Sequence, residues 1–359
     1  MEKRFKGAGP MILCSGMSIE AGFQAILGGC ITQIQDNAIG VVRGADSESI
    51  HQMRVGLRQL RSALGLFARW IPCPPTLQQE LGWLASELGA ARDADVLAHG
   101  TLPKVLDICP HDAELLLLGE AVSMIACGKK QQAAAAVASE RYSRLMRHLV
   151  AWLHNKDWRE SFAESARKRL AQPLAGRATL ILARRHERLI ALGKRLKEST
   201  PEVRHEVRIA AKKARYATDF FQSLYPARRV RRYLKGLEAL QDSLGWLNDA
   251  AVAQPLLHEM ATRCPELMRG ASFARGCLCA TIQHDLPGLD RVWKRFNSRE
   301  LPWVCPDRHQ QRHRRDRGQQ PGRRKGERRP RHLPQAPKSN RGRNQHQPGH
   351  EMEPAEGGA

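Results

Sequence analysis

The sequence has few aromatic residues, no C-x-x-C cysteine pair and no long apolar run. Phe, Trp and Tyr make up 5% of the 359 residues, so Leu, Ala, Val and Ile must form most of the core. The nine cysteines are irregularly spaced without a C-x-x-C pair, which favours reduced thiols over a disulfide framework or a zinc site. No window of about 20 apolar residues occurs, so no membrane span is expected.

Two further patterns are missing. Alternating runs of β-branched residues bounded by turn residues are nearly absent, which predicts an all-α fold. The glycine-rich G-x-x-x-x-G-K-[ST] loop that binds nucleotide phosphates is also absent. Apolar residues at helical spacing instead continue over about residues 18–296.

The charge is strongly unbalanced. The chain carries a formal net charge of +22 at pH 7. From Ser298 onward 15 Lys and Arg face 7 Asp and Glu, a net +8, so the preceding residues carry +14 of the +22. The basic character therefore belongs to the helical body as well as to the tail. Such a charge favours a polyanionic partner: nucleic acid, an anionic membrane surface or polyphosphate.

A seventeen-residue segment occurs twice, at 51–67 and 205–221, with an offset of 154 residues. Arg58 and Lys212 share their charge, and Val55 and Ile209 share their branching. The identical pairs are His51/His205, Arg54/Arg208, Arg61/Arg215, Ala63/Ala217 and Phe67/Phe221. On a helix, the histidine and the cations three, seven and ten residues later fall within about 80° of the circumference.

Each segment separates its cations from its apolar side. In the first, Met53, Leu57, Leu60, Leu64 and Phe67 lie opposite the cations, which is typical of a helix that packs against a core. Arginine offers planar, permanently charged donors that suit phosphate oxygens, and histidine donates to phosphate most strongly once protonated. The repetition favours two half-sites for one anionic ligand over two solvated helix faces.

A second motif repeats in the same order. L-G-A-A-R-D ends at Asp93 and L-G-W-L-N-D ends at Asp249, an offset of 156 residues. Two motifs repeated in order indicate an internal duplication. The two aspartates are expected to cap helices or to pair with arginines rather than to act in catalysis.

These paired motifs closely resemble the CHAD domain, the conserved histidine α-helical domain. They read H-x-M-R-V-x-x-R-x-L-R with L-G-x-x-R-D, and H-x-x-R-I-x-x-K-K-x-R-Y with L-x-x-L-Q-D-x-L-G-x-L-N-D. The resemblance covers about residues 18–296. It implies two similar four-helix-bundle-like halves, related by a pseudo-twofold repeat, around a basic central groove that binds inorganic polyphosphate. We therefore expect a binding protein rather than an enzyme, with no cofactor and no metal.

The polyphosphate ligands that the resemblance implies are His51, Arg54, Arg58, Arg61, His205, Arg208, Lys212, Lys213 and Arg215. Gln59 departs from the family pattern, which usually has a second arginine there. The acidic E-x-E-x-K signature of the triphosphate-tunnel domain, which accompanies some members, is absent, so we expect a stand-alone member. Five cations on other helices could line the same groove, but for each of them an exposed, solvated side chain is the favoured interpretation. These secondary candidates are Arg141, Arg144, Arg184, Arg188 and Lys235.

The expected domain organisation has four parts. Residues 18–155 and about 160–296 form the two halves, and a disordered extension at 1–17 precedes them. Pro, Gly, Gln, Arg and His dominate residues 297–359, which predicts a disordered tail. That tail is either a basic arm for polyanions or an extension with no selected role. Helices are expected over about 18–43, 75–90, 111–139, 140–155, 160–198 and 228–247. Thr200 and Pro201 predict the start of the helix that holds His205.

Two other functions stay open. A metal-dependent phosphohydrolase would use the pairs His111-Asp112 or His284-Asp285, but no suitable partner histidine and distal aspartate are evident. Nucleic acid is a second candidate partner through the basic tail, although neither cationic segment interleaves the aromatic residues typical of single-strand binders. The oligomeric state is open. The expected location is the cytoplasm, with polyphosphate granules as a candidate site.

Overall fold

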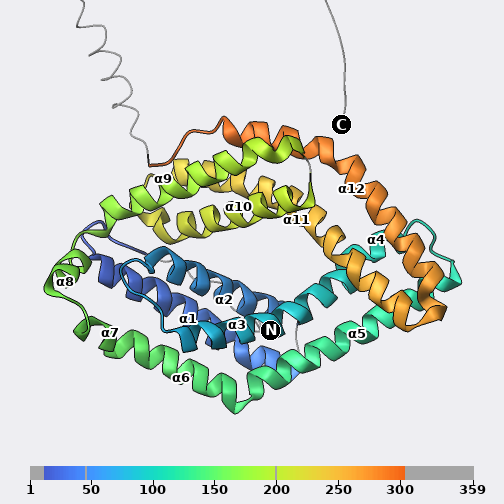
Figure 1. The fold of residues 1–359 in the computed structure, drawn as a ribbon, viewed down its shortest axis with the longest axis horizontal. Coiled ribbons are helices and arrows are strands. Elements are labelled where there is room, and N and C mark those ends of the chain that lie inside the picture. The colour runs from blue at the N-terminus through green and yellow to red at the C-terminus, as the bar shows by residue number, and fades with distance from the viewer. Residues whose placement is uncertain (1–11, 45–46, 199, 304–359) are drawn as a thin grey trace, which may run out of the picture. The chain divides into compact units, whose positions relative to one another are not determined.

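The computed structural model describes residues 12–44, 47–198 and 200–303. These residues form helices joined by short turns, and no strand occurs among them (Figure 1). The all-α prediction is therefore confirmed. None of the helices in these ranges is long and apolar enough to cross a membrane.

In chain order the α-helices are α1 (Ile19–Gly44), α2 (Ser47–Phe67), α3 (Pro75–Val96), α4 (Pro103–Leu106), α5 (Ala113–Ala138), α6 (Glu140–Asn155), α7 (Asp157–Glu160), α8 (Glu164–Leu170), α9 (Leu174–Gly193), α10 (Pro201–Phe221), α11 (Ala227–Arg263) and α12 (Met268–Asn297). Four short helical turns join them: the π-helix η1 (Leu97–Thr101) and the 3₁₀ turns η2 (Lys194–Glu198), η3 (Gln222–Leu224) and η4 (Pro265–Leu267).

Several helices begin at a residue whose side-chain oxygen accepts a hydrogen bond from an amide of the first turn. The Asp112 carboxylate accepts from the Leu115 amide at 2.9 Å where α5 begins, and the Ser139 hydroxyl accepts from Tyr142 where α6 begins. Thr200 caps α10, and Pro201 occupies its first turn. A side-chain oxygen at this place pairs an amide that has no partner within the helix. The start of α10 agrees with the sequence prediction.

Three predicted helix ranges are wrong. The helix expected over 75–90 continues to Val96 and includes Arg92 and Asp93. The long helix expected over 160–198 is divided into α8, α9 and η2. Pro173 lies between α8 and α9, and a proline has no amide hydrogen with which to continue the preceding helix. The helix expected over 228–247 extends through Pro255 to Arg263. At 1.5 Å per residue, its 37 residues span about 55 Å.

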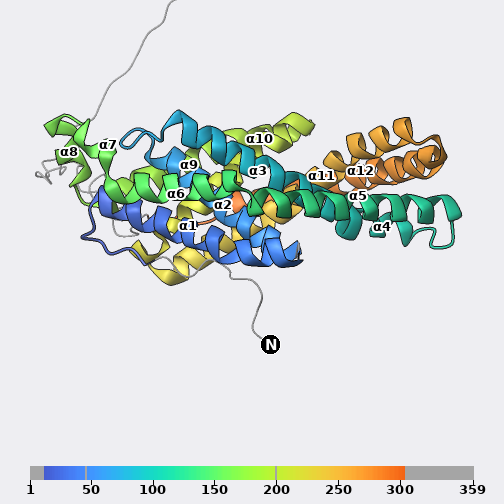
Figure 2. The ribbon, with the colours of Figure 1, turned by 90° about the horizontal axis from the view of Figure 1, so that it is seen from below.

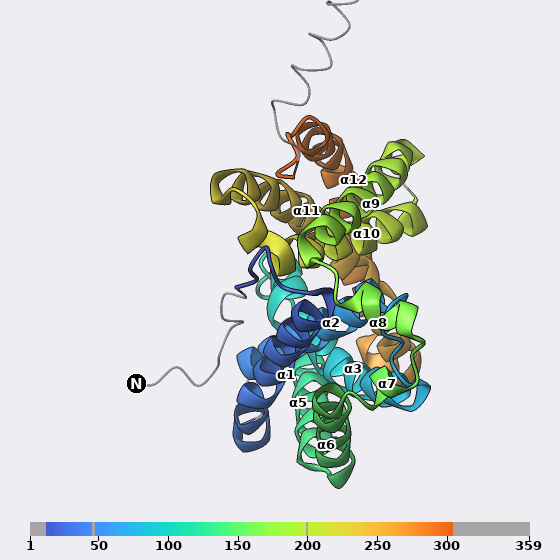
Figure 3. The ribbon, with the colours of Figure 1, turned by 90° about the vertical axis from the view of Figure 1, so that its left-hand side faces the viewer.

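The buried apolar residues form three clusters. The first packs α1, α2, α3 and α6 together with the beginning of α9 and the end of α10. The second packs the rest of α9 and α10 against α11 and the end of α12. The third joins η1, α4 and α5 to the second half of α11 and the first half of α12. Figure 3 shows α9, α10 and α11 on one side and α1, α2 and α3 on the other.

The core clusters do not divide at residues 155–160, where the sequence places the boundary between the two halves. Two of the three clusters contain helices from both sides of that boundary. The long α11 makes the third cluster possible, because its first half packs with α9 and α10 and its second half reaches α5. The predicted duplication stays a prediction from the sequence.

The packed body extends farther along the chain, at both ends, than the sequence predicted. Leu13 is buried, its amide donates to the Ser223 hydroxyl at 2.9 Å, and that hydroxyl donates back to the Leu13 carbonyl. Beyond α12, Arg299 donates to the Arg232 carbonyl at 2.7 Å and Trp303 packs on Tyr233. Residues 12–17 and 298–303 therefore belong to the packed body. The extension expected at 1–11 and the tail expected at 304–359 lie outside the described residues.

Candidate functional site

The two histidine-led segments form α2 and α10, and each histidine is the fifth residue of its helix. The predicted apolar side of α2 is buried, including Met53, Leu57 and Leu60. The two helices contact one another near the centre of the molecule (Figure 1). Each helix packs its apolar side into a core, so the cationic sides face the region between them.

Four of the predicted ligands interact electrostatically across this contact. They are Arg54 and Arg58 of α2, and Arg208 and Lys212 of α10. We name these four residues the cationic cluster. Burial lowers the pKa of Arg54, and the positive charges of Arg58 and Arg208 lower it further. Burial likewise lowers the pKa of Arg208, with a smaller contribution from Arg58. The side chains of Arg54 and Arg208 are only 25% and 18% exposed, so water screens these charges incompletely.

Lys212 responds most strongly to this environment. Burial, followed by the charges of Arg208, Arg58 and Arg54, lowers the pKa of its ammonium group from 10.5 to about 7. At neutral pH this position therefore carries an uncharged amine far more often than an ordinary lysine does. The Lys212 side chain forms no hydrogen bond or ion pair with another residue in the described ranges. An anion between α2 and α10 would restore its charge.

Three buried donor or acceptor atoms in or beside the cluster lack a hydrogen-bond partner among the described residues. They are Nε of Arg58, Nε of Arg208 and Nδ1 of His51. Buried polar atoms of this kind are almost always paired, because an unpaired one loses its hydration without compensation. Phosphate oxygens are suitable acceptors for both guanidinium groups. The arrangement therefore fits a site that is completed by an anionic ligand.

Two aspartates balance only part of the positive charge. Asp93 Oδ1 lies 3.4 Å from a terminal nitrogen of Arg54, and Asp249 Oδ1 lies 4.0 Å from the corresponding nitrogen of Arg208. The prediction that these aspartates pair with arginines is confirmed. Each pair joins the cationic sequence motif to the aspartate motif of the same half. The aspartates orient one arginine on each helix and leave Arg58 and Lys212 without an ion pair in the described ranges.

The two histidines have different environments. His51 is half-buried, and burial followed by the nearby charge of Arg92 lowers its pKa, while Glu48 opposes this. His205 is exposed and lines a cavity of about 590 Å³ between α10 and α11. His51 therefore lies beside the cationic cluster, whereas the cavity beside His205 contains none of the four cluster residues.

Three other predicted ligands do not join the cluster. Arg61 and Lys213 are exposed, and their side chains form no hydrogen bond or ion pair with described residues. Arg215 donates to Gln241 at 3.1 Å and lies 3.8 Å from carboxylates of Asp219 and Glu238. The guanidinium of Arg215 is therefore already held by partners on its own helix and on α11.

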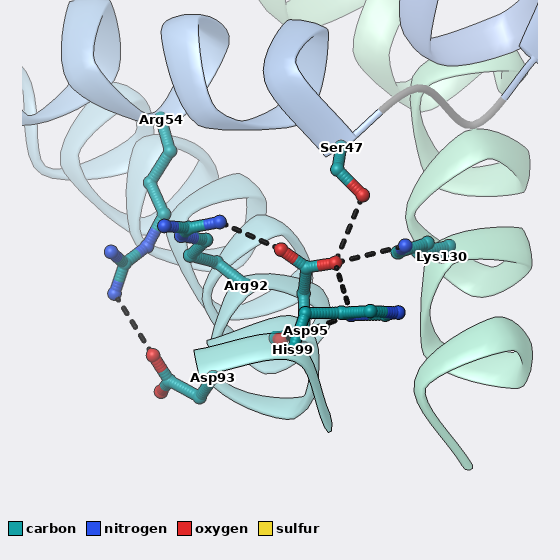
Figure 4. Close-up of polar contacts among 7 residues, drawn as sticks. All are labelled: Ser47, Arg54, Arg92, Asp93, Asp95, His99 and Lys130. Carbon is teal, nitrogen blue, oxygen red and sulfur yellow. Dashed lines mark hydrogen bonds and ion pairs between the residues drawn. The ribbon is translucent and has the colours of Figure 1, made fainter. Parts of the chain in front are cut away.

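Arg92 is a neighbour of the cluster that the sequence prediction missed. Its charge lowers the pKa of His51 and, after burial and Arg58, that of Arg54. Arg92 Nη1 donates to Asp95 Oδ2 at 2.7 Å, which holds the guanidinium near Arg54 (Figure 4). The signal was available, because Arg92 stands next to Asp93 in the repeated motif. The second half has Asn248 at the matching place, so the repetition did not single out Arg92.

Asp95 connects four elements beside this site. Its buried carboxylate accepts from Ser47 of α2 and from Lys130 of α5, each at 2.9 Å. It also accepts from Arg92 of α3, and His99 of η1 lies within 3.2 Å (Figure 4). Burial opposes ionisation of this carboxyl, but the bonds from Lys130 and Ser47 lower its pKa overall. Asp95 therefore positions Arg92 and the start of α2 relative to α5.

The secondary candidates are exposed, as expected of solvated cations. Arg141 is held by a two-point contact with Glu80, at 2.7 and 3.0 Å, and lies over the Trp83 ring. The two His-Asp pairs also have structural explanations. Asp112 caps α5, and Asp285 accepts from the Trp246 indole at 2.9 Å. No group of three or more potential metal-ligating side chains occurs within the described part of the chain.

Comparison with known proteins identifies the fold. The family model of the CHAD domain matches residues 25–258. The chain belongs to the CHAD domain family. The crystal structure of the CHAD domain from the plant Ricinus communis is 38% identical in sequence. That match covers 83% of this chain and 99% of the plant chain, with a TM-score of 0.74.

A more distant structure shares the CHAD fold. PptA from Streptomyces chartreusis is 14% identical and has a TM-score of 0.57, over 78% of this chain and 99% of its own. At that identity the likeness concerns the fold alone. A search of curated proteins finds no significant match.

Proposed function

We propose that this CHAD protein binds inorganic polyphosphate through the cationic cluster, with His51 and Arg92 beside it. The observation that supports this most directly is the convergence of four half-buried cations from two helices, with unpaired Nε atoms on Arg58 and Arg208. A monovalent anion would balance only one of these charges. A chain of linked phosphates carries a charge on each unit and matches a row of cations.

The remaining predicted ligands have a lesser role in this proposal. Arg61, Lys213 and His205 are exposed and are positioned to attract a long polyanion electrostatically rather than to bind it in a desolvated site. Arg215 would have to leave Gln241 and two carboxylates before it contacts a phosphate. We therefore expect charge reversal within the cluster to affect affinity more than charge reversal at these positions.

The decisive experiment reverses the cluster. Replacement of Arg54, Arg58, Arg208 and Lys212 by Glu is expected to abolish polyphosphate binding measured by isothermal titration calorimetry. The matched control reverses four exposed arginines that have no ion pair in the described ranges, namely Arg167, Arg169, Arg228 and Arg231. Circular dichroism verifies that both variants keep their helical content. Binding retained by the cluster variant, or lost equally in the control, contradicts the proposed site.

The same proteins separate binding from the other two functions. Incubation of polyphosphate with the purified protein and Mg²⁺ or Mn²⁺ leaves the chain length unchanged if the protein only binds. Shortening of the chain would favour a phosphohydrolase. Competition by RNA or DNA at equal phosphate concentration would favour a nucleic-acid binder. A cytoplasmic location and association with polyphosphate granules follow from this proposal and are tested by imaging a tagged protein.

A further inference from the structure

Arg215 is the predicted ligand that continues the cationic side of α10 beyond the cationic cluster. It comes seven residues after Arg208 and three after Lys212, which places the three side chains within about 60° of the helix circumference. Along the helix axis it lies about 4.5 Å from Lys212. The structure nevertheless holds its guanidinium group in contacts outside the cluster.

Each nitrogen of the Arg215 guanidinium group faces a different oxygen. Nε lies 3.8 Å from Oδ2 of Asp219 on the same helix, and one terminal nitrogen lies 3.8 Å from Oε1 of Glu238 on α11. The other terminal nitrogen donates to Oε1 of Gln241 at 3.1 Å. We name Asp219, Glu238 and Gln241 the Arg215 clamp. Only the contact with Gln241 has the length of a hydrogen bond, so charge attraction alone joins Arg215 to the two acids.

The two acids of the clamp differ in their exposure to water. The side chain of Asp219 is 28% exposed and that of Glu238 is 56% exposed, so water screens Glu238 more strongly. Burial raises the pKa of Asp219 from 3.8 to about 6, while the charge of Arg215 opposes this shift and that of Glu238 adds to it. These two are the charged groups that face Asp219 from α10 and α11. Asp219 therefore loses its charge near pH 6, where an ordinary aspartate is still ionised.

The Arg215 clamp borders a cavity beside the cationic cluster. Gln241 lines this cavity of about 470 Å³ together with Arg92 and Asp249. Arg92 lies beside the cluster, and Asp249 pairs with Arg208. The cavity lies at the middle of α11, whose second half extends with α4, α5 and α12 beyond α2 and α10 (Figure 2). A phosphate chain that leaves the cluster past Arg92 would therefore approach the clamp.

One donor of the Arg215 clamp is unused. Nε2 of Gln241 is buried and has no hydrogen-bond partner among the described residues, although buried donors are almost always paired. A phosphate oxygen in the adjoining cavity could accept a hydrogen bond from this nitrogen. The clamp thus has a further contact to offer a ligand that reaches it.

The first half of the duplicated sequence lacks such a clamp. With the offsets of 154 and 156 residues between the repeated motifs, the positions that match Asp219, Glu238 and Gln241 hold Gly65, Gly82 and Ala85. Arg61, which matches Arg215, is exposed, and its side chain has no partner among the described residues. Because glycine and alanine carry no polar side chain, the clamp belongs to the second half alone.

We infer that the Arg215 clamp is an autoinhibitory contact, which withholds Arg215 from polyphosphate at neutral pH and releases it as the pH falls. The inference rests on the proposed function and adds control of the affinity by pH. Protonation of Asp219 removes the less screened of the two negative charges, and the exposed Glu238 then attracts Arg215 only weakly. The released guanidinium group can bind a phosphate oxygen through a charge-assisted hydrogen bond.

The test compares the polyphosphate affinity of the full chain at about pH 7 and about pH 5.5, by isothermal titration calorimetry. Asp219→Asn removes the negative charge at every pH. It is expected to raise the affinity at neutral pH by roughly fivefold and to reduce the further gain in acid. Glu187→Gln is the matched control, because it removes an exposed charge without a described ion pair from α9, which packs with α10. His51 gains charge in acid in all of these proteins, so the comparison isolates Asp219.

Arg215→Met separates the release of Arg215 from the simple loss of a repelling acid. Alone, it is expected to change the neutral affinity little and to remove most of the gain in acid. Asp219→Asn in the same protein is then expected to have no further effect. Circular dichroism verifies that each variant is folded. An equal gain from Asp219→Asn with and without Arg215, or an equal gain in Glu187→Gln, overturns the inference. Absence of binding by the wild-type protein at both pH values contradicts the proposed function itself, which is a distinct result.

Discussion

Arg92 Nη1 donates a 2.7 Å hydrogen bond to Asp95 Oδ2, and this contact links the cationic cluster to the framework of the fold. The same carboxylate accepts from Ser47 and Lys130, so it holds α2, α3 and α5 together. A single buried acid thus determines where a guanidinium beside the binding region points.

Asp95→Asn is expected to destabilise the protein by about 2 kcal/mol, because the amide cannot accept from three donors and leaves charged groups unpaired. The lowered pKa of Asp95 sets the pH dependence. Its stabilising contribution is present above the ordinary carboxyl pKa and is lost as the pH falls through the lowered value. Urea unfolding at pH 7 and at successively lower pH measures this. Asp107→Asn, at an exposed carboxylate without a described ion pair, should change little.

Lys212→Met is expected to stabilise the free protein and to weaken polyphosphate binding. A desolvated ammonium group among three arginines is unfavourable without a ligand, so its removal should raise the melting temperature by about 2 °C. The same change removes a charge that a phosphate chain would use. Lys213→Met is the control, because its exposed side chain has no described partner. A melting temperature that falls in Lys212→Met would contradict the repulsion argument.

Polyphosphate binding is expected to take up protons near neutral pH. The pKa of free Lys212 is about 7, and an adjacent polyanion raises it toward the ordinary value. The complex therefore holds more protons than the free partners, and affinity should decrease as the pH rises from about 7 to 9. Calorimetry in buffers of different ionisation enthalpy measures the proton uptake. Lys212→Met should show less uptake, and an identical pH dependence in the two proteins would count against this assignment.

Truncation after Trp303 is expected to preserve most of the polyphosphate affinity and the stability of the body. Truncation after Asn297 removes Arg299 and Trp303, which bond to Arg232 and pack on Tyr233 at a ring distance of 5.2 Å. That shorter protein should melt at a lower temperature. Calorimetry and thermal melts of the full chain and both truncations compare these effects. A large loss of affinity on removal of 304–359 alone would show that the tail carries a major part of the binding.

The fold class and several helix features could be predicted from local sequence patterns. The absence of strand patterns predicted an all-α fold, and periodicity predicted the buried side of α2, from Met53 to Phe67. A capping threonine and a proline predicted the start of α10 at residue 201. These features depend on neighbours within a few residues, so the sequence expresses them directly.

The boundaries depended on distant contacts. Leu13 is ordered because Ser223, some 210 residues away, bonds its backbone. The halves share the third core cluster because α11 continues past residue 247 to reach α5. No local pattern at Leu13 or at the end of the predicted helix records the partner that lies across the fold.

The sequence by itself determined which residues share the cationic side of each helix: four positions on α2 and their counterparts on α10. Only the tertiary structure decided that Arg54, Arg58, Arg208 and Lys212 interact electrostatically, while Arg61 stays exposed and Arg215 donates to Gln241. Two crossing helices approach closely over a short length, so residues on the same side but farther from the crossing do not meet. Periodicity specifies a direction around one helix axis, and the packing of two helices selects which residues along that direction come together.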